Sequence, residues 1–170
     1  MEAVKNGKLD QLNILFERYS RRVYNYFLKS TLDRDGSNDL TQDVFTRILK
    51  YRRSYRLESR FETWMFQIAR NLIKDHFTKM KVYRDHFDWT DELPDQADET
   101  NEDGEKERRL YRALEKLPVE KRELLVMSKF QKMKYEQIAT IREVSVGAIK
   151  VQVHRAIAEL RNIYFEENGE

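Results

Sequence analysis

Apolar residues recur every three or four positions through most of this chain, and this spacing constrains its fold more than any other feature. The pattern predicts helices over residues 9–29, 37–50 and 60–79, and several shorter helices after residue 107. The chain has only five glycines and two prolines to interrupt its helices. We therefore expect an all-α protein in which the first three helices form one bundle.

The helical spacing stops between residues 82 and 105, where acidic residues dominate. Residues 81–106 contain 10 Asp and Glu against 3 Lys and Arg, a net charge of −7. Residues 1–80 carry 16 Lys and Arg against 10 acidic residues, a net of +6, and residues 107–170 carry 13 against 10, a net of +3. We expect two small helical domains, an N-terminal helical bundle (1–80) and a C-terminal domain (107–170), joined by a flexible acidic linker (81–106). Basic domains suit a polyanionic partner, but an ordinary solvated surface has the same composition.

Several kinds of chemistry are excluded by the residues that the chain lacks. It contains no cysteine, so disulfides, thiolate metal sites and cysteine nucleophiles are ruled out. The three histidines, His76, His86 and His154, are scattered, and no phosphate-binding glycine loop or paired-histidine metal motif is present. We expect no enzyme activity, no metal and no other cofactor. No apolar run is long enough for a membrane span, and the first ten residues lack a signal-peptide core, so we expect a cytoplasmic protein without membrane insertion.

The C-terminal pattern is a short helix, a tight turn and a longer helix that begins after Ser145, which is typical of a helix-turn-helix. In such motifs the second helix lies in the major groove of DNA and presents its outer side to the base edges. Lys150 and Arg155 suit phosphates or guanine, Gln152 suits adenine, and Val151 suits a thymine methyl group. A packed helical hairpin without DNA has the same pattern, and this segment alone does not separate the two interpretations.

The residues of this segment resemble the promoter-binding region of extracytoplasmic-function sigma factors. The resemblance lies in Tyr135–Ala139, in Val144–Lys150 and in His154–Ala156, with Leu114, Leu117, Pro118 and Arg122 upstream. It implies that the last helix reads the −35 promoter element. The implied DNA-binding residues are Ser145, Ala148, Lys150, Val151, Gln152, His154 and Arg155. The chain departs from the family at the turn, where Arg142 and Glu143 replace leucine and glycine. It departs again at Val151 and Gln152, where serine and arginine are usual, so the resemblance implies the mode of docking but not which bases are read.

The segment Asp39–Phe45 resembles the family's signature for binding the polymerase clamp. The implied partner is the coiled coil of the β′ subunit, and the implied contact residues are Asp39, Leu40, Gln42, Asp43 and Phe45. Helical geometry turns Leu40 inward, whereas the two aspartates and the amide project outward. An alternative is that the aspartates only stabilise the N-terminus of their helix.

The segment Phe61–Asn71 resembles the region of the family that melts the promoter and holds the single-stranded −10 element. The implied −10 residues are Tyr55, Arg56, Phe61, Phe66, Arg70, Asn71 and Lys74. Aromatic rings suit stacking on bases, arginines suit phosphates, and the Asn71 amide suits the edge of a flipped base. Phe61 has a core role as its alternative.

Taken together, the resemblances imply a sigma factor that directs the bacterial RNA polymerase core, through its β and β′ subunits, to promoter DNA and assists melting. They also imply an anti-sigma factor as a partner, and an acidic linker that passes through the polymerase's RNA exit path. Two other readings stay open. The main rival is a polymerase-independent helix-turn-helix regulator, and the second is a helical adaptor without a nucleic-acid role.

Overall fold

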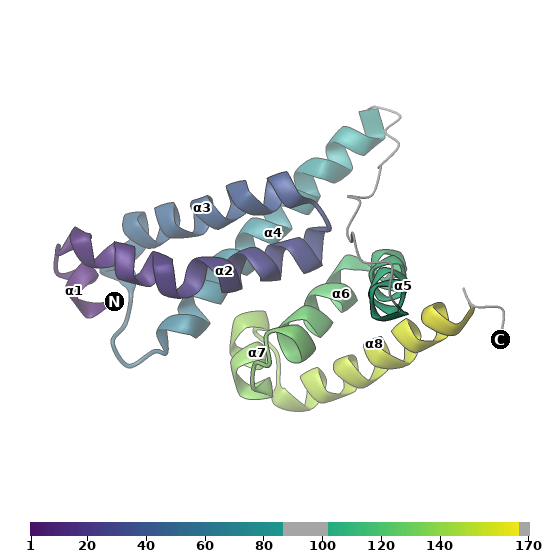
Figure 1. The fold of residues 1–170 in the computed structure, drawn as a ribbon. Coiled ribbons are helices and arrows are strands. Elements are labelled where there is room, and N and C mark those ends of the chain that lie inside the picture. Colours follow the sequence, from purple (N-terminus) through teal and green to yellow (C-terminus); the bar gives the residue numbers. More distant parts are fainter. Residues whose placement is uncertain (87–101, 167–170) are drawn as a thin grey trace.

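All regular structure in residues 1–86 and 102–166, which the computed structural model describes, is helical (Figure 1). Side chains are described for residues 1–80, 105–106 and 108–166. The N-terminal unit contains α1 (Glu2–Lys5), η1 (Leu9–Gln11), α2 (Leu12–Thr31), α3 (Arg34–Tyr51), η2 (Arg52–Ser54) and α4 (Phe61–His86). The C-terminal unit contains α5 (Glu102–Lys116), α6 (Val119–Leu125), the π-helical turn η3 (Val126–Phe130), α7 (Tyr135–Arg142) and α8 (Val146–Glu166). The all-α prediction and the two helical units are confirmed.

The apolar stripes of α2, α3 and α4 meet in the core of the N-terminal bundle. Residues from each helix are fully enclosed there, namely Val23, Phe27, Val44, Ile48 and Met65. The three helices lie side by side, and the C-terminal end of α4 projects beyond its neighbours (Figure 1). Burial of these stripes, rather than helix propensity, supplies most of the stability of helices of this kind.

The start of α3 differs from the sequence prediction. Asp33 caps the helix, because its carboxylate accepts a hydrogen bond from the Gly36 amide at 3.0 Å. Ser37, a good capping residue at which the predicted helix 37–50 begins, lies inside the first turn and is buried. Both residues are good capping residues, so the sequence alone favoured the wrong one.

Helix α4 continues to His86, beyond its expected end near Lys79. Helix α5 begins at Glu102, so residues 102–106 are also helical. The rest of the predicted acidic linker, residues 87–101, lies outside the described part of the chain, and so does its expected flexibility. None of the described helices is long and apolar enough to cross a membrane.

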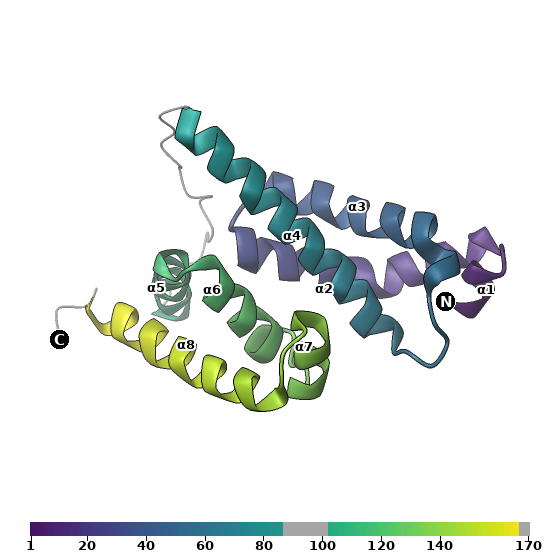
Figure 2. The same ribbon diagram turned by 180° about the vertical axis from the view of Figure 1, so that it is seen from behind.

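The C-terminal unit packs against the bundle instead of standing apart from it. Helix α7 contacts α4, and both α6 and η3 contact α2. One continuous core includes Val23 and Phe66 of the first unit with Met127, Met133 and Ile141 of the second. Seen from behind, α6 and α7 lie along the bundle, and α8 lies on the far side of the second unit (Figure 2). A smaller core of Leu114, Leu117, Leu125 and Ala156 holds α8 in place.

Candidate polymerase and nucleic-acid interfaces

Helix α8 presents a polar face to solvent and an apolar face to the core. Ile149, Val153 and Ala156 are buried. On the opposite side are the residues predicted to read the −35 element: Lys150, Val151, His154 and Arg155 are exposed, and Ala148 and Gln152 are half-buried. Ser145 caps the helix as predicted, since its hydroxyl accepts a hydrogen bond from the Ala148 amide at 3.1 Å. The structure therefore brings this set together on one accessible surface. Ile157, which the apolar spacing of the last helix places toward the core, is 38% exposed.

The turn before α8 contains the two residues that depart from the family pattern. Glu143 ends α7 in the left-handed conformation, with φ of 59° and ψ of 42°. The usual glycine adopts this conformation without strain, whereas glutamate does not. Arg142 turns inward and donates hydrogen bonds to Glu123 Oε2 at 3.0 Å and to the Glu120 carbonyl at 3.2 Å. Burial lowers the pKa of Arg142 from its ordinary value, and the nearby Glu123 opposes that shift.

Helix α3 separates the predicted polymerase-binding residues into two groups. Asp39, Gln42 and Asp43 are exposed on its outer face. Leu40 is 8% exposed and Phe45 is 5% exposed, so both belong to the core. The Phe45 ring packs edge-on against Phe16, with ring centroids 4.8 Å apart. The outer face is thus acidic and polar, and the two apolar residues hold it in position.

The predicted −10 residues before and at the start of α4 are only partly accessible. Arg56 is exposed. Tyr55, expected to offer a stacking face, is 6% exposed, and its hydroxyl donates to the Ser59 carbonyl at 2.6 Å. Burial raises the pKa of Tyr55, as does the neighbouring Glu58. Phe61 is half-buried in a cluster of rings with Tyr19, Tyr55 and Trp64, in agreement with its alternative core role.

Further along α4, some of the predicted −10 residues are buried and others are exposed. The expectation of an accessible ring is wrong for Phe66, which is fully enclosed and meets Tyr26 edge-on at 5.2 Å. The Arg70 side chain is 13% exposed, with Nε 3.6 Å from Glu123 Oε1. Asn71 and Lys74 point to solvent. These two residues and Arg56 form the accessible part of the predicted −10 surface.

A buried charged cluster, which the sequence did not reveal, lies beneath this surface. Glu123 of α6 is 4% exposed, and it accepts a hydrogen bond from the Tyr26 hydroxyl at 2.8 Å and pairs with Arg70 and Arg142. Burial raises the pKa of Tyr26 well above its ordinary value, and Glu123 adds to the shift. In the sequence, Glu123 belongs to the charged run 120–123, which is typical of a solvated surface. The run of charged residues in the sequence does not show that the side chain of Glu123 faces inward.

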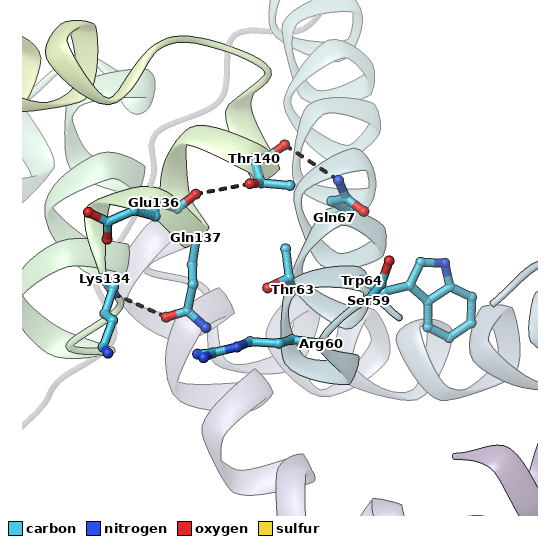
Figure 3. Close-up of a pocket in the computed structure, with 9 residues that line it drawn as sticks. All are labelled: Ser59, Arg60, Thr63, Trp64, Gln67, Lys134, Glu136, Gln137 and Thr140. Atoms are coloured by element: carbon cyan, nitrogen blue, oxygen red, sulfur yellow. Dashed lines mark hydrogen bonds between the residues drawn. The ribbon is translucent and has the colours of Figure 1, made fainter. Parts of the chain in front are cut away.

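A polar groove separates α4 from α7 (Figure 3). Its volume is about 540 Å³. From α4 and the loop before it come Ser59, Arg60, Thr63, Trp64 and Gln67, and from α7 and its start come Lys134, Glu136, Gln137 and Thr140. Gln67 spans the groove by donating a hydrogen bond to the Thr140 carbonyl at 3.4 Å. Among the described residues, no group of three or more His, Asp or Glu side chains is placed to hold a metal ion.

Comparison with known protein families gives two matches, in the same order as the two units. The family model for Sigma-70 region 2 matches residues 15–82. The model for Sigma-70 region 4 matches residues 107–160. The first match covers α3 and nearly all of α4, and the second covers the helix-turn-helix.

Individual relatives can be aligned with this chain over most of its length. The chain is 29% identical over 169 residues to the RNA polymerase sigma factor CarQ of Myxococcus xanthus, an alignment that covers 98% of this chain and 96% of CarQ. It is 26% identical over 160 residues to the ECF RNA polymerase sigma factor SigX of Bacillus subtilis, covering 89% and 82% of the two chains.

Solved structures share the fold. The sigma factor RpoE of Bartonella quintana, crystallised with the anti-sigma factor NepR, superposes with a TM-score of 0.73 at 20% identity over 89% of this chain and 94% of RpoE. CnrH, in complex with the cytosolic domain of CnrY, gives a TM-score of 0.72 at 20% identity, over 94% and 91% of the two chains.

Proposed function

The chain belongs to the sigma-70 family of RNA polymerase sigma factors, within its extracytoplasmic-function (ECF) group, and from that premise we propose which of its surfaces performs each step of initiation. As a sigma factor it directs core RNA polymerase to promoters. The proposal assigns three surfaces: the outer face of α3 to the polymerase, the start of α4 to the opened −10 strand, and the outer face of α8 to the −35 duplex.

The outer face of α3 is the proposed contact with the polymerase clamp. Asp39, Gln42 and Asp43 are exposed together there and supply carboxylate and amide groups to a basic surface. Leu40 and Phe45 act indirectly, because their burial fixes the rotation of the helix about its axis. This replaces the expectation that all five residues touch the polymerase.

The proposed contact with the −10 strand uses Arg56, Asn71 and Lys74, which are exposed. Arg56 and Lys74 supply positive charge for phosphates, and the Asn71 amide suits the edge of an unstacked base. Arg70 belongs to the same surface by position, but in this structure its charge is engaged by Glu123. Tyr55 and Phe61 support the loop that carries Arg56.

The outer face of α8 is the proposed reader of the −35 element. The observation that carries this assignment is the exposure of Lys150, Val151, His154 and Arg155 together on the outer side of α8, within the region 4 match. This face carries several hydrogen-bonding groups and one apolar side chain, Val151, which are the kinds of group that read base edges directly. The chain supplies no chemistry of its own in this scheme, since binding energy drives strand opening.

Further elements of the proposal concern partners and location. We expect the chain to act in the cytoplasm, where polymerase and promoters meet. We also expect an anti-sigma factor to regulate it, because a protein of similar fold, RpoE of Bartonella quintana, was crystallised with the anti-sigma factor NepR.

Run-off transcription tests the proposed function. Purified chain and core polymerase are incubated with a pool of DNA that carries a randomised upstream region, and the transcribed molecules are sequenced. A sigma factor should enrich two short motifs at a fixed separation, and only when core polymerase is present. Enrichment of a motif by the chain alone would instead identify a polymerase-independent regulator, and no enrichment under either condition would contradict both functions.

A further inference from the structure

Residues 55–60 form the α3–α4 loop, which carries Arg56 of the proposed −10 surface. Two hydrogen bonds close this loop on itself. The Tyr55 hydroxyl donates to the Ser59 carbonyl at 2.6 Å, and the Ser59 amide donates to the Arg56 carbonyl at 3.0 Å. The tip of the loop is solvated, since Arg56 and Glu58 are exposed and Leu57 is 51% exposed. The loop thus presents its tip to solvent in a defined shape.

The bundle holds the beginning of this loop through side chains. Arg52, in η2, donates a hydrogen bond to the Leu49 carbonyl at 2.7 Å, which ties the residues before the loop to α3. The Tyr55 ring lies 5.1 Å from the Trp64 ring and 6.2 Å from the Phe61 ring, measured between centroids, and this ties it to α4. These contacts fix the side chain of Tyr55, but they do not involve its backbone carbonyl.

The N-terminal segment 1–8 holds that carbonyl. Helix α1 lies beside the start of the loop and contacts η2 (Figure 1, Figure 2). Lys5 Nζ donates a hydrogen bond to the Tyr55 carbonyl at 2.6 Å, and a bond from a charged donor is stronger than one between neutral groups. Val4 is 1% exposed and Met1 packs against the core of the bundle, so α1 has a fixed position from which Lys5 reaches the loop.

The place of this contact in the backbone gives it a specific effect. The Tyr55 carbonyl belongs to the peptide unit that joins Tyr55 to Arg56, and a peptide unit is planar. A hydrogen bond to its oxygen therefore restricts the rotation of the whole unit. The orientation of this plane sets the direction in which the chain leaves Tyr55, and with it the direction in which the Arg56 side chain projects.

We propose that Lys5 is a positioning residue for recognition of the −10 strand: by holding the Tyr55 carbonyl, it keeps the α3–α4 loop in the shape that presents Arg56 to the opened DNA. The inference rests on the proposed function, because that function assigns Arg56 to the strand. Lys5 lies outside residues 15–82, which match the region 2 model. Without the contact the loop samples more shapes, and the apparent affinity for the strand falls with the fraction that is competent to bind.

The first experiment measures loop closure without polymerase or DNA. The amides of Tyr55 and Ser59 are hydrogen-bonded in the closed loop. Lys5→Met keeps the aliphatic stem and removes the donor, so we expect both amides to exchange about fivefold faster, as measured by NMR. The matched control is Lys8→Met, because Lys8 is exposed in the same segment and the substitution removes the same charge. Equal exchange in the two variants would overturn the proposal.

The second experiment measures selective capture of opened DNA by the holoenzyme. Its probes are a single-stranded oligonucleotide with the −10 motif that run-off transcription selects and a scrambled oligonucleotide, and the ratio of the two affinities reports recognition. We expect Lys5→Met to lower this ratio about fivefold and Lys8→Met to leave it unchanged. Lys5→Arg keeps a cationic donor and should recover the ratio to within about twofold of the unmodified chain. Affinity for core polymerase and the preferred −35 sequence should stay the same in all three variants.

The other outcomes separate positioning from charge and from general stability. An equal fall of the ratio in Lys5→Met and Lys8→Met would trace it to charge alone and would overturn the proposal. A matching loss of affinity for core polymerase would do the same, because a general loss of structure produces it. Circular dichroism checks the helices, and Lys5→Gln, which is uncharged and shorter, replaces Lys5→Met if that variant loses helix. If the unmodified holoenzyme binds both oligonucleotides equally, the proposed −10 function fails, and the exchange measurement still decides whether Lys5 holds the loop.

Discussion

The backbone conformation of Glu143 lowers the stability of the folded chain by a measurable amount. Its φ of 59° lies in the left-handed region, where a side chain costs about 1–2 kcal/mol and glycine costs little. Glu143→Gly should therefore raise the free energy of unfolding by about 1 kcal/mol, after the greater freedom of glycine in the unfolded chain is counted. Urea unfolding followed by circular dichroism measures the change. Thr140→Gly, in the interior of α7, is the control and should destabilise the chain.

His76 makes stability depend on pH. Burial lowers its pKa from the ordinary value, Lys79 acts in the same direction, and Asp33 opposes them. The unfolded chain therefore binds the proton at a higher pH than the folded chain does, so stability should fall as the pH drops through about 6.5 toward the folded pKa. Unfolding free energies at pH 7.5 and pH 5.5 test this. His76→Gln should lose less stability over the interval, and an identical loss in both proteins would contradict the assignment to His76.

At the residue scale, local chemistry predicted one helix cap correctly and another wrongly. Ser145 at the start of the last helix is confirmed, whereas α3 is capped by Asp33 and not by Ser37. Burial of Tyr55 and Phe66 was not anticipated, because an aromatic ring in a basic segment suits stacking on bases as well as it suits a core. Which of the two applies depends on elements far away in the chain.

Helix α3 gives a prediction about a surface rather than a single group. Replacing its two exposed carboxylates, Asp39→Asn together with Asp43→Asn, should weaken binding of core polymerase by about thirtyfold, since two charge-assisted contacts are lost and each contributes roughly 1 kcal/mol. Fluorescence anisotropy with labelled chain measures the affinity. Asp35→Asn, in the first turn of the same helix, should leave it nearly unchanged. Equal affinity for all three proteins would remove α3 from the proposed interface.

Helix α8 gives a parallel prediction for duplex DNA. With the holoenzyme on its selected promoter, Lys150→Ala and Arg155→Ala should each weaken binding about five- to tenfold. A residue that contacts only phosphate should also reduce the slope of affinity against salt by about one, whereas a residue that reads a base should change the preferred sequence. Lys129→Ala, an exposed cation in η3, serves as the control. Unaltered binding by both α8 variants would favour a packed hairpin without a DNA role.

At the element scale, the helices could be predicted well from apolar spacing, and their ends could not. In α2, α3, α4 and α8, most of the apolar residues that recur every three or four positions are buried. Helix α4 exceeds its expected end because Met80 and the residues after it still permit a helix, and no glycine or proline stops it. Helix α3 starts early because Asp33, not Ser37, provides the cap.

Because the two units share a core, a destabilising substitution in one unit should also destabilise the other. Met133 is 7% exposed and belongs to the C-terminal unit, yet it lines the same gap as Phe66. Met133→Ala should cost roughly 2 kcal/mol and should speed amide hydrogen exchange around Phe66 in α4, on the opposite side of the interface. Mass spectrometry of peptic fragments locates the effect. Leu117→Ala, in the separate core under α8, should leave exchange in α4 unaltered. Faster exchange confined to the C-terminal unit would contradict a shared core.

At the scale of the whole molecule, the sequence predicted two helical units but not their docking. Composition identified an acidic segment between them, and such a segment gives no information about how its flanking units meet. Besides the shared apolar core, the docking brings together the polar groups of Glu123, Arg70 and Gln131, and residues of these types are usually exposed. Local patterns describe which side of each helix is apolar, whereas an interface of mixed character depends on the exact placement of complementary charges.

The reach of Arg70 toward Glu123 has a thermodynamic consequence for promoter opening. A ligand that requires a minor state of a protein binds with an apparent dissociation constant that is raised by the reciprocal of that state's population. A ligand of the Arg70 guanidinium must in the same way displace Glu123 first, so the free energy of this ion pair is subtracted from the free energy of binding.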